Sequence, residues 1–203
     1  MRPYQIKSST KVNYNNKMGF KYAIRNDGLY FLTFATVDWV DVFTRKELAD
    51  VILESLKYCQ KEKGLQIFAW CLMPSHIHLL ASAGMNGDLS AIMRDFKKFT
   101  SKKIIETIKE IPESRREWML DRFEFAGRFD KRITNYKFWQ EGTHPMEIFS
   151  DKFIKQKLVY IHENPVKAGI VWEAWQYQFS SAIDYYGKGK GLLDVEYLGA
   201  ITL

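Results

Sequence analysis

Two histidines separated by one residue, His76 and His78, stand in the segment 71–80, CLMPSHIHLL. In an extended strand, alternate side chains share a face, so the two imidazoles would project side by side while Ile77 points to the opposite face. Neutral imidazole is a common ligand of divalent metals, and two of them on a rigid strand supply half of a metal site. A strand with two histidines and no metal fits the same spacing, so the pair needs a partner.

Polar side chains recur at the spacing of one helical face in the segment 151–164. The stripe consists of Gln156, Tyr160, Glu163 and Asn164. Tyr160 and Asn164, four residues apart, would face one site. A phenol can act as a nucleophile that forms a covalent intermediate, and a metal on the histidines would polarise the phosphoryl oxygen of its target. The Asn164 amide oxygen would complete the ligand set. Tyr160 also lies seven residues after Phe153, a spacing equally typical of a residue that borders the core.

Three strands are needed to position the histidines, and the sequence predicts them. Residues 30–37 (YFLTFATV) are aromatic and β-branched, which favours a first strand. Residues 66–73 and 76–83 predict a second and a third strand, separated by a turn at Pro74-Ser75. The two histidines fall on the third strand.

Caps, chain breakers and apolar spacing predict three helices. They run from a Thr44 cap to about Lys63 before Gly64, from Asp88 or Ser90 onward, and from Ser150 or Asp151 to about Asn164 before Pro165. The initial order β-α-β-β-α is that of a ferredoxin-like split βαβ unit. We therefore predict an α+β fold, an antiparallel sheet with helices on one face. Residues 115–139 show no clear period, and the aromatic segment from Ile170 is expected to pack on the domain.

The composition indicates a folded protein without a membrane span. A chain of 203 residues with 46% hydrophobic residues fits one domain with a buried core. No segment reaches the roughly 18 uninterrupted apolar residues of a membrane helix, and the start lacks a signal-peptide apolar core. Cys59 and Cys71 are not spaced as a zinc or redox pair, which indicates a reduced, cytoplasmic protein.

The net charge of +6 is located in an N-terminal arm. Six basic and no acidic residues precede Asp27, and the remaining 24 basic and 24 acidic residues balance. Such an arm suits contact with a polyanion and is equally typical of an ordinary solvated tail. We divide the chain into a basic arm at 1–28, a domain at 29–187 and a tail at 188–203.

The segments 73–80 (MPSHIHLL) and 160–169 (YIHENPVKAG) resemble motifs of the single-tyrosine HUH transposases, the insertion-sequence-200-like type. Within that family they most resemble the REP-associated tyrosine transposases. Residues 138–142 (FWQEG), His144, and 180–182 (SSA) before Tyr185 are also similar to the family. The resemblance runs in the family's order from about Tyr30 to Tyr186.

The resemblance implies a ferredoxin-like HUH endonuclease fold with a C-terminal extension. His76 and His78 match the pair that binds one Mg²⁺ or Mn²⁺, and Asn164 matches the residue that completes the metal site. Tyr160 matches the nucleophile that attacks a single-stranded DNA phosphodiester, leaving a 5′-phosphotyrosine and a free 3′-hydroxyl at hairpin-associated sites. The resemblance implies single-stranded or hairpin DNA as the partner, and a monomer or homodimer.

Two positions depart from the family pattern. The residue before the first histidine is usually Asn, whereas this chain has Ser75, and residues 143–145 keep His144 but not the longer family pattern. Neither change removes a ligand or the nucleophile. They leave open which DNA element is recognised.

Basic residues in two segments are candidates for DNA contact. Arg94, Lys98 and Lys102 recur at i+4 on a helix face that we expect beside the proposed site. Residues 115–132 interleave cations with aromatic rings, a combination that suits single-stranded DNA. A solvated helix face and aromatics that fill the core are the alternative interpretations. The predicted contacts are Arg94, Lys97, Lys98, Lys102, Arg128, Lys131, Arg132 and His144.

The sequence therefore predicts a metal-dependent single-stranded DNA endonuclease and strand transferase. The main alternative is a domesticated DNA-hairpin-binding protein that no longer cuts. A metallohydrolase acting on a small phosphoester would need an acidic metal cage, for which Asp88 and Glu163 are close only in sequence.

Overall fold

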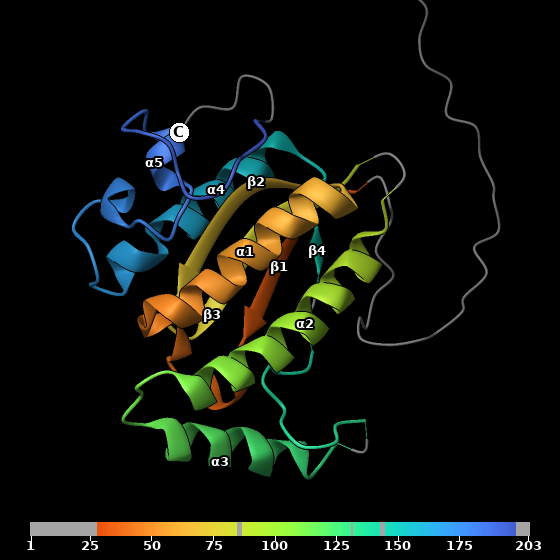
Figure 1. The fold of residues 1–203 in the computed structure, drawn as a ribbon. Helices are drawn as coiled ribbons and strands as arrows, with labels where there is room; N and C mark the ends of the chain where they lie inside the picture. The colour runs from red at the N-terminus through yellow and green to blue at the C-terminus, as the bar shows by residue number, and fades with distance from the viewer. Residues whose placement is uncertain (1–27, 85–86, 131, 143–144, 198–203) are drawn as a thin grey trace, which may run out of the picture.

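The structure is a computed structural model that describes residues 28–84, 87–130, 132–142 and 145–197 (Figure 1). The strands are β1 (Tyr30–Ala35), β2 (Leu65–Met73), β3 (His76–Ala83) and the short β4 (Met146–Glu147). The α-helices are α1 (Lys46–Lys63), α2 (Leu89–Glu110), α3 (Arg116–Gly127), α4 (Asp151–Lys167) and α5 (Ala182–Tyr185). Three short 3₁₀ helices are η1 (Val37–Trp39), η2 (Val42–Thr44) and η3 (Ala174–Gln176).

The four strands form one antiparallel sheet in the order β2-β3-β1-β4. The two central strands pair along their whole length, from Tyr30 opposite Ala81 to Ala35 opposite His76. The predicted α+β, ferredoxin-like class is confirmed. The predicted turn at Pro74-Ser75 also joins β2 to β3 as expected, so His76 begins β3 at one end of the sheet.

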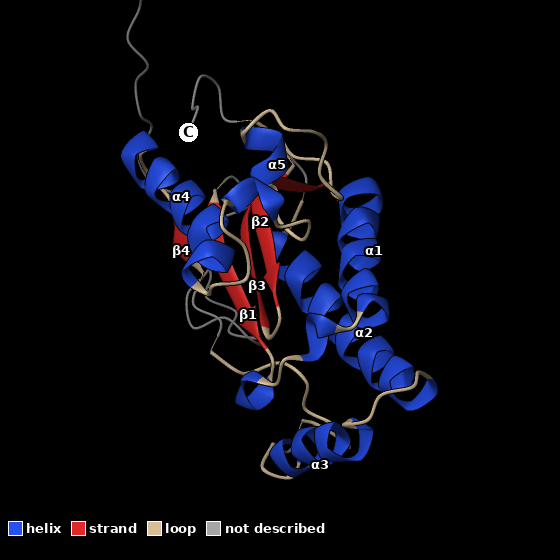
Figure 2. Cartoon of the chain, turned by 90° about the vertical axis from the view of Figure 1, so that its left-hand side faces the viewer, coloured by secondary structure: helices blue, strands red, loops and turns tan. Residues whose placement is uncertain are grey.

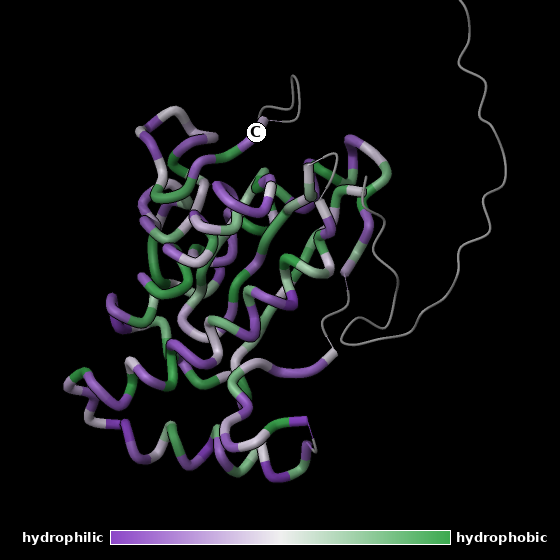
Figure 3. Tube along the Cα trace, turned by 45° about the vertical axis from the view of Figure 1, so that its right-hand side comes forward, coloured by the Kyte–Doolittle hydropathy of each residue, from purple (hydrophilic) through white to green (hydrophobic). Residues whose placement is uncertain are grey.

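Helices cover both faces of the sheet (Figure 2). On one face α1 and α2 pack over the main core, which includes Leu32 and Phe34 of β1. On the other face α4 packs over a second apolar cluster that includes Phe31 and Leu80. The prediction of helices on one face is correct for α1 and α2 and wrong for α4, because alternate strand residues are apolar toward both sides. In Figure 3 hydrophobic stretches run through the interior of the domain, and hydrophobic and polar residues alternate along the helices.

The predicted helix ends are mostly confirmed. Gly64 ends α1 with a left-handed φ of 72°, Asp88 caps α2 by accepting from the Ala91 N–H, and Ser150 caps α4 by accepting from the Phe153 N–H. The Thr44 cap is wrong: α1 begins after Arg45. The Thr44 hydroxyl instead donates to the Asp41 carbonyl and so closes η2.

The predicted end of α4 near Asn164 is wrong, because the helix continues through Pro165 to Lys167. Proline lacks the N–H for one helical hydrogen bond, but only one turn remains after it. That turn is closed by the Ala168 N–H, which donates to the Asn164 carbonyl, and by the Ile170 N–H, which donates to the Pro165 carbonyl. Pro165 is also buried, and its packing offsets part of the loss.

The segment from residue 170 packs on the domain, as predicted, and runs along the outer edge of β2. The Leu72 N–H donates to the Phe179 carbonyl and the Ser181 N–H donates to the Trp70 carbonyl. Further along the same edge, the Glu196 N–H donates to the Ile67 carbonyl. This segment also buries Leu193 in the main core.

Helix α3 lies at the end of the sheet where β1 ends and β3 begins (Figure 1). The side chain of Glu113, just before α3, is completely buried and links this region to the start of α1. Arg45 Nε donates to it at 2.7 Å, and the Arg115 N–H donates at 2.9 Å. The Arg45 hydrogen bond lowers the pKa of Glu113 to about 2.

We expect Glu113→Gln to lower the free energy of unfolding at pH 7 by about 1–3 kcal/mol, because a charge-assisted hydrogen bond is lost. Arg45 is half-exposed, so solvent screening favours the lower end. The folded pKa lies below the ordinary value of 4.5, so this contribution is complete above pH 4.5 and declines as the pH falls toward 2.

Urea denaturation of both proteins at neutral and acidic pH measures this difference. Asp50→Asn, which removes the exposed ion pair with Lys46, is the control and should cost less than about 0.5 kcal/mol. A difference between Glu113→Gln and the parent that does not shrink below pH 4.5 would contradict the role of the ionised carboxylate.

Within the described residues, no helix combines the length and the hydrophobicity required to cross a membrane. Cys59 and Cys71 are both buried and carry free thiols.

Candidate metal and nucleophile site

His76 and His78 lie on the face of β3 that is covered by α4. Their ring centroids are 4.7 Å apart, with the rings nearly perpendicular at 77°. Ile77 is buried in the main core on the opposite face. The alternation expected from the sequence thus brings the two imidazoles together beneath α4.

One ring nitrogen of His78 lies within hydrogen-bond distance of a hydroxyl, and the other has no hydrogen-bond partner among the described residues. Its Nδ1 is 2.8 Å from the Thr33 hydroxyl on the neighbouring strand. Its Nε2 is buried, and among the described residues it has no hydrogen-bond partner. Burial lowers the pKa of His78 to about 3, with smaller contributions from the charges of His76 and Lys157, so the ring is neutral at pH 7.

His76 is more exposed than His78, and its Nδ1 also lies near a hydroxyl group. Its Nδ1 is 3.2 Å from the Ser75 hydroxyl, and burial lowers its pKa below 6.5. The Ser75 hydroxyl therefore supports the first histidine much as the Thr33 hydroxyl supports the second. The indole of Trp39 meets the His76 ring edge-on, with centroids 5.3 Å apart.

Tyr160 projects from α4 toward the histidines. Its ring centroid is 5.2 Å from that of His78 and 5.7 Å from that of Phe31. The residue is 40% exposed, so its phenol is accessible to a substrate. The Nζ atom of Lys157, one turn earlier on α4, is 5.5 Å from the tyrosine ring and 4.5 Å from that of Phe31.

Asn164 lies one turn after Tyr160. Its Nδ2 donates to the Tyr160 carbonyl at 2.9 Å, which leaves the amide oxygen as the group that a metal would take. Divalent cations such as Mg²⁺ and Mn²⁺ accept oxygen ligands, and Mn²⁺ also accepts imidazole.

The chemistry of the donors, two adjacent imidazoles and an amide oxygen one turn after Tyr160, suits a divalent ion. The test of fit is the buried Nε2 of His78: in metal-binding histidines one ring nitrogen commonly donates to a supporting oxygen while the other ligates. In the part of the chain that the structure describes, no three His, Cys, Asp or Glu side chains cluster as a metal site. A metal here would therefore depend on Asn164 and on substrate or water oxygens.

The predicted DNA contacts on α2 are not beside this site. Helix α2 covers the opposite face of the sheet from the histidines, so the expected position is wrong. Lys97 is half-buried above the Phe34 ring, at 5.3 Å, and burial lowers its pKa to about 8. Arg94, Lys98 and Lys102 are exposed on the outer side of α2. The reason is that the apolar residues of α2 complete the main core, which turns its polar side away from α4.

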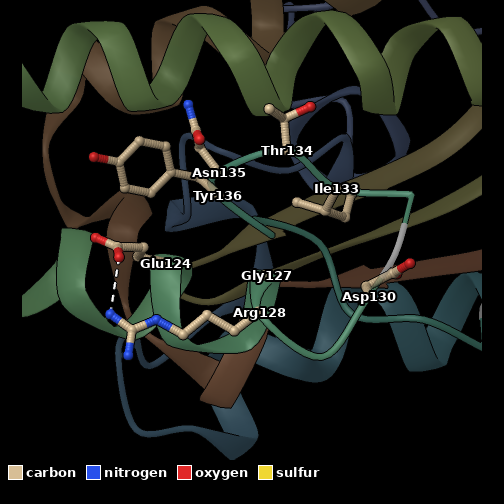
Figure 4. A pocket seen from close by; sticks show the side chains of 8 residues that line it. All are labelled: Glu124, Gly127, Arg128, Asp130, Ile133, Thr134, Asn135 and Tyr136. Atoms are coloured by element: carbon tan, nitrogen blue, oxygen red, sulfur yellow. Dashed lines mark hydrogen bonds and ion pairs between the residues drawn. The ribbon is translucent and has the colours of Figure 1, made fainter.

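Two further predicted contacts, Arg128 and Arg132, lie just after α3. Arg128 donates to Glu124 on the preceding turn and borders a hollow of about 490 Å³ (Figure 4). Arg132 is paired with Asp130 and Glu141. Lys131 and His144 lie outside the described residues.

His162 points away from the histidine pair, as expected from its position two residues after Tyr160. It is buried, its Nε2 is 2.8 Å from the Ser181 hydroxyl, and its ring packs against Tyr185. Its contacts connect α4 to the C-terminal segment.

Four residues of this site were not predicted from the sequence. They are Phe31, Thr33, Trp39 and Lys157. The spacing of Lys157, three residues before the tyrosine on one helix, is a signal that the sequence contains. The others come from β1 and η1, and only the register that sets Thr33 opposite His78 reveals them.

The backbone of η1 is unusual. Asp38 and Trp39 both have positive φ, at 53° and 55°, which non-glycine residues seldom adopt. Each such residue costs on the order of 1–3 kcal/mol and persists only where the surrounding structure holds it in place. The strain is stored directly beside His76.

Comparison with known proteins gives three similarities. The family model described as IS200-like transposase matches residues 28–134, a span that includes the histidine pair and ends before α4. A protein of Haemophilus influenzae classed as a REP-associated tyrosine transposase is 29% identical over 157 residues, covering 76% of this chain and 79% of that protein. The structure of a REP-associated tyrosine transposase bound to a REP hairpin aligns with a TM-score of 0.56 at 19% identity. That alignment covers 95% of this chain and 94% of the other, and it supports the fold.

Proposed function

The chain belongs to the IS200-like transposase family, and from that premise we propose that it is a divalent-metal-dependent endonuclease and strand transferase for single-stranded DNA. Tyr160 is the proposed nucleophile, and His76, His78 and Asn164 are the proposed metal ligands. The observation that carries the proposal is the buried Nε2 of a neutral His78, which has no hydrogen-bond partner among the described residues and whose ring lies 5.2 Å from the Tyr160 ring.

In the proposed reaction the Tyr160 hydroxyl attacks a phosphodiester phosphorus. A bond forms between the phenolic oxygen and phosphorus, and the bond from phosphorus to the 3′-oxygen breaks. The phenol proton passes to solvent and the leaving 3′-oxygen takes a proton from solvent, so the products are a 5′-phosphotyrosine and a 3′-hydroxyl. When bound, the metal would polarise the scissile phosphate. The Nζ atom of Lys157, 5.5 Å from the tyrosine ring, would attract the phosphate to the nucleophile.

Hairpin-forming DNA is the proposed partner. The similar protein bound to a REP hairpin supports this choice. We further propose that the basic arm at 1–28 contacts DNA outside the domain at 29–187. The exposed residues Arg94, Lys98, Lys102, Arg128 and Arg132 remain proposed phosphate contacts.

A covalent-adduct gel tests the proposed function. The full chain is incubated with labelled single-stranded hairpin oligonucleotides and Mn²⁺, with and without chelator. A denaturant-resistant band that needs the metal is the expected result. Binding to every oligonucleotide with no band in any lane, including strands derived from the chain's own genomic surroundings, would favour the non-cutting hairpin binder.

We expect Thr33→Val to lower the apparent affinity for Mn²⁺ in cleavage about 10- to 100-fold, because the valine removes the hydroxyl that orients His78. The shape is nearly conserved, so the fold should survive. The measurement is the cleavage rate against Mn²⁺ concentration. Thr44→Val is the control, because the exposed Thr44 hydroxyl donates to the Asp41 carbonyl and not to a histidine. An unchanged metal dependence for Thr33→Val would show that the Thr33 hydroxyl does not support a ligand.

A further inference from the structure

We propose that Trp39 forms a stacking site for an unpaired nucleobase of the strand that is to be cut. The inference rests on the proposed function, because it concerns the nucleotide beside the scissile phosphate. Its basis is an exposed indole, in contact with His76, that a strained but firmly held backbone presents to solvent.

The first step is the position of the indole. η1 follows β1 directly, and the last residue of β1, Ala35, pairs with His76. The Trp39 and His76 ring centroids are 5.3 Å apart. This distance is comparable to one or two nucleotide steps along a strand, at about 3.4 Å each. A base on the indole would therefore belong to a nucleotide next to a phosphate held at the histidines.

The second step is the exposure of the indole. Trp39 is 56% exposed, although the first residue of η1 and the residue that follows η1 contribute to the core. Val37 and Val40 are both buried. A tryptophan that served only the core would be turned inward with them. Aromatic rings left open beside a strand-binding surface are the usual stacking platforms for single-stranded nucleic acids, because every base has a π-face.

The third step is the rigidity of the support. The buried Thr36 donates its N–H to the Ser75 carbonyl at 2.9 Å, and its hydroxyl lies 2.8 Å from the Val40 carbonyl. The Val37 N–H donates to the Phe138 carbonyl at 2.8 Å. These bonds fix both ends of η1, so Asp38 and Trp39 are held at positive φ. A backbone that is fixed before binding reduces the entropy lost when a base stacks on the side chain that it carries.

The fourth step is the charge next to the indole. Asp38 is exposed, and its carboxylate repels a phosphate placed over the ring. A base carries no such charge. The surface around Trp39 therefore favours a nucleobase over the sugar-phosphate backbone, which would lie toward His76 and Lys157.

The test compares two strands that differ only in their bases. Binding of the full chain to oligo-deoxyadenosine and to an abasic strand of equal length is measured in chelator, so that no cleavage intervenes. The ratio of the two affinities reports what the bases contribute to binding, and the Trp39 variants isolate the share of the indole. We expect Trp39→Leu to reduce this ratio about tenfold, the scale of one lost base stack, and Trp39→Phe to retain most of it.

Phe99→Leu is the matched control, because Phe99 is an equally exposed aromatic, at 59%, on α2 across the sheet. Leucine at position 39 keeps apolar cover over His76, so a merely shielding role predicts no change in the ratio. An unchanged ratio in a folded Trp39→Leu protein overturns the inference, as does a parent chain that binds neither strand at low salt. A Trp39-dependent ratio in a chain that never forms an adduct supports the stacking site and rejects the nuclease.

Discussion

Replacing Tyr160 by phenylalanine is expected to abolish covalent attachment to DNA, by at least about a thousandfold, because the variant lacks only the attacking oxygen. Binding of the same strand should change little. The ring still packs against Phe31 and His78, and the stability of the fold should be retained. The measurement is the yield of denaturant-resistant adduct beside an affinity measurement in chelator.

Tyr186→Phe is the matched control for this experiment. Tyr186 has the same exposed fraction as Tyr160, 40%, but it follows α5 in the C-terminal segment. Its substitution should leave the adduct unchanged. If Tyr160→Phe still forms the adduct and Tyr186→Phe does not, the nucleophile is Tyr186 and the assignment to Tyr160 is wrong.

The second large effect is expected for His78→Ala. Loss of a ligand should cost more than the roughly 10- to 100-fold of a supporting residue, so we expect cleavage at millimolar Mg²⁺ to fall by at least about a hundredfold. Mn²⁺ binding, followed by electron paramagnetic resonance of the free ion, should weaken in parallel. DNA binding in chelator should remain.

Because His78 is buried, the alanine variant can also lose stability through a cavity. His78→Gln fills more of the space and offers an amide oxygen, so partial recovery with Mn²⁺ is expected. His162→Gln is the control: it can keep a hydrogen bond to Ser181 and lies away from the pair. Full activity of folded His78→Ala at low metal concentration would mean that the histidine pair is structural.

The sequence predicted the elements whose apolar period is clean. Such patterns predicted the three long strands. They also predicted that α1 ends before Gly64, that α2 starts after Asp88, and where α4 starts. Helix α3 was not predicted. Its buried positions, Met119, Phe123 and Gly127, do have helical spacing, but exposed aromatics lie before, between and after them and hide the period. The exposed rings are Trp118, Phe125 and Phe129.

The candidate site was predictable only in part. The two-residue spacing of His76 and His78 fixes their common face, and the structure brings Tyr160 to them. The supports from β1 depend on strand register, which no local pattern specifies. The position of α2 across the sheet depends on which helix face completes the core, and a stripe of lysines does not determine that.

The hydrogen bonds along β2 also bear on self-association. β2 is one outer strand of the sheet, and an uncovered outer strand is a template for the strand of another molecule. Here the segment around Phe179, Ser181 and Glu196 already occupies backbone groups of β2 at three places. Tyr177 and Tyr185 add hydroxyl donors to the Leu72 and Phe68 carbonyls. The C-terminal segment thus covers the outer edge of β2. Two copies that join by extending their sheets would have to pair at β4, the other outer strand, instead.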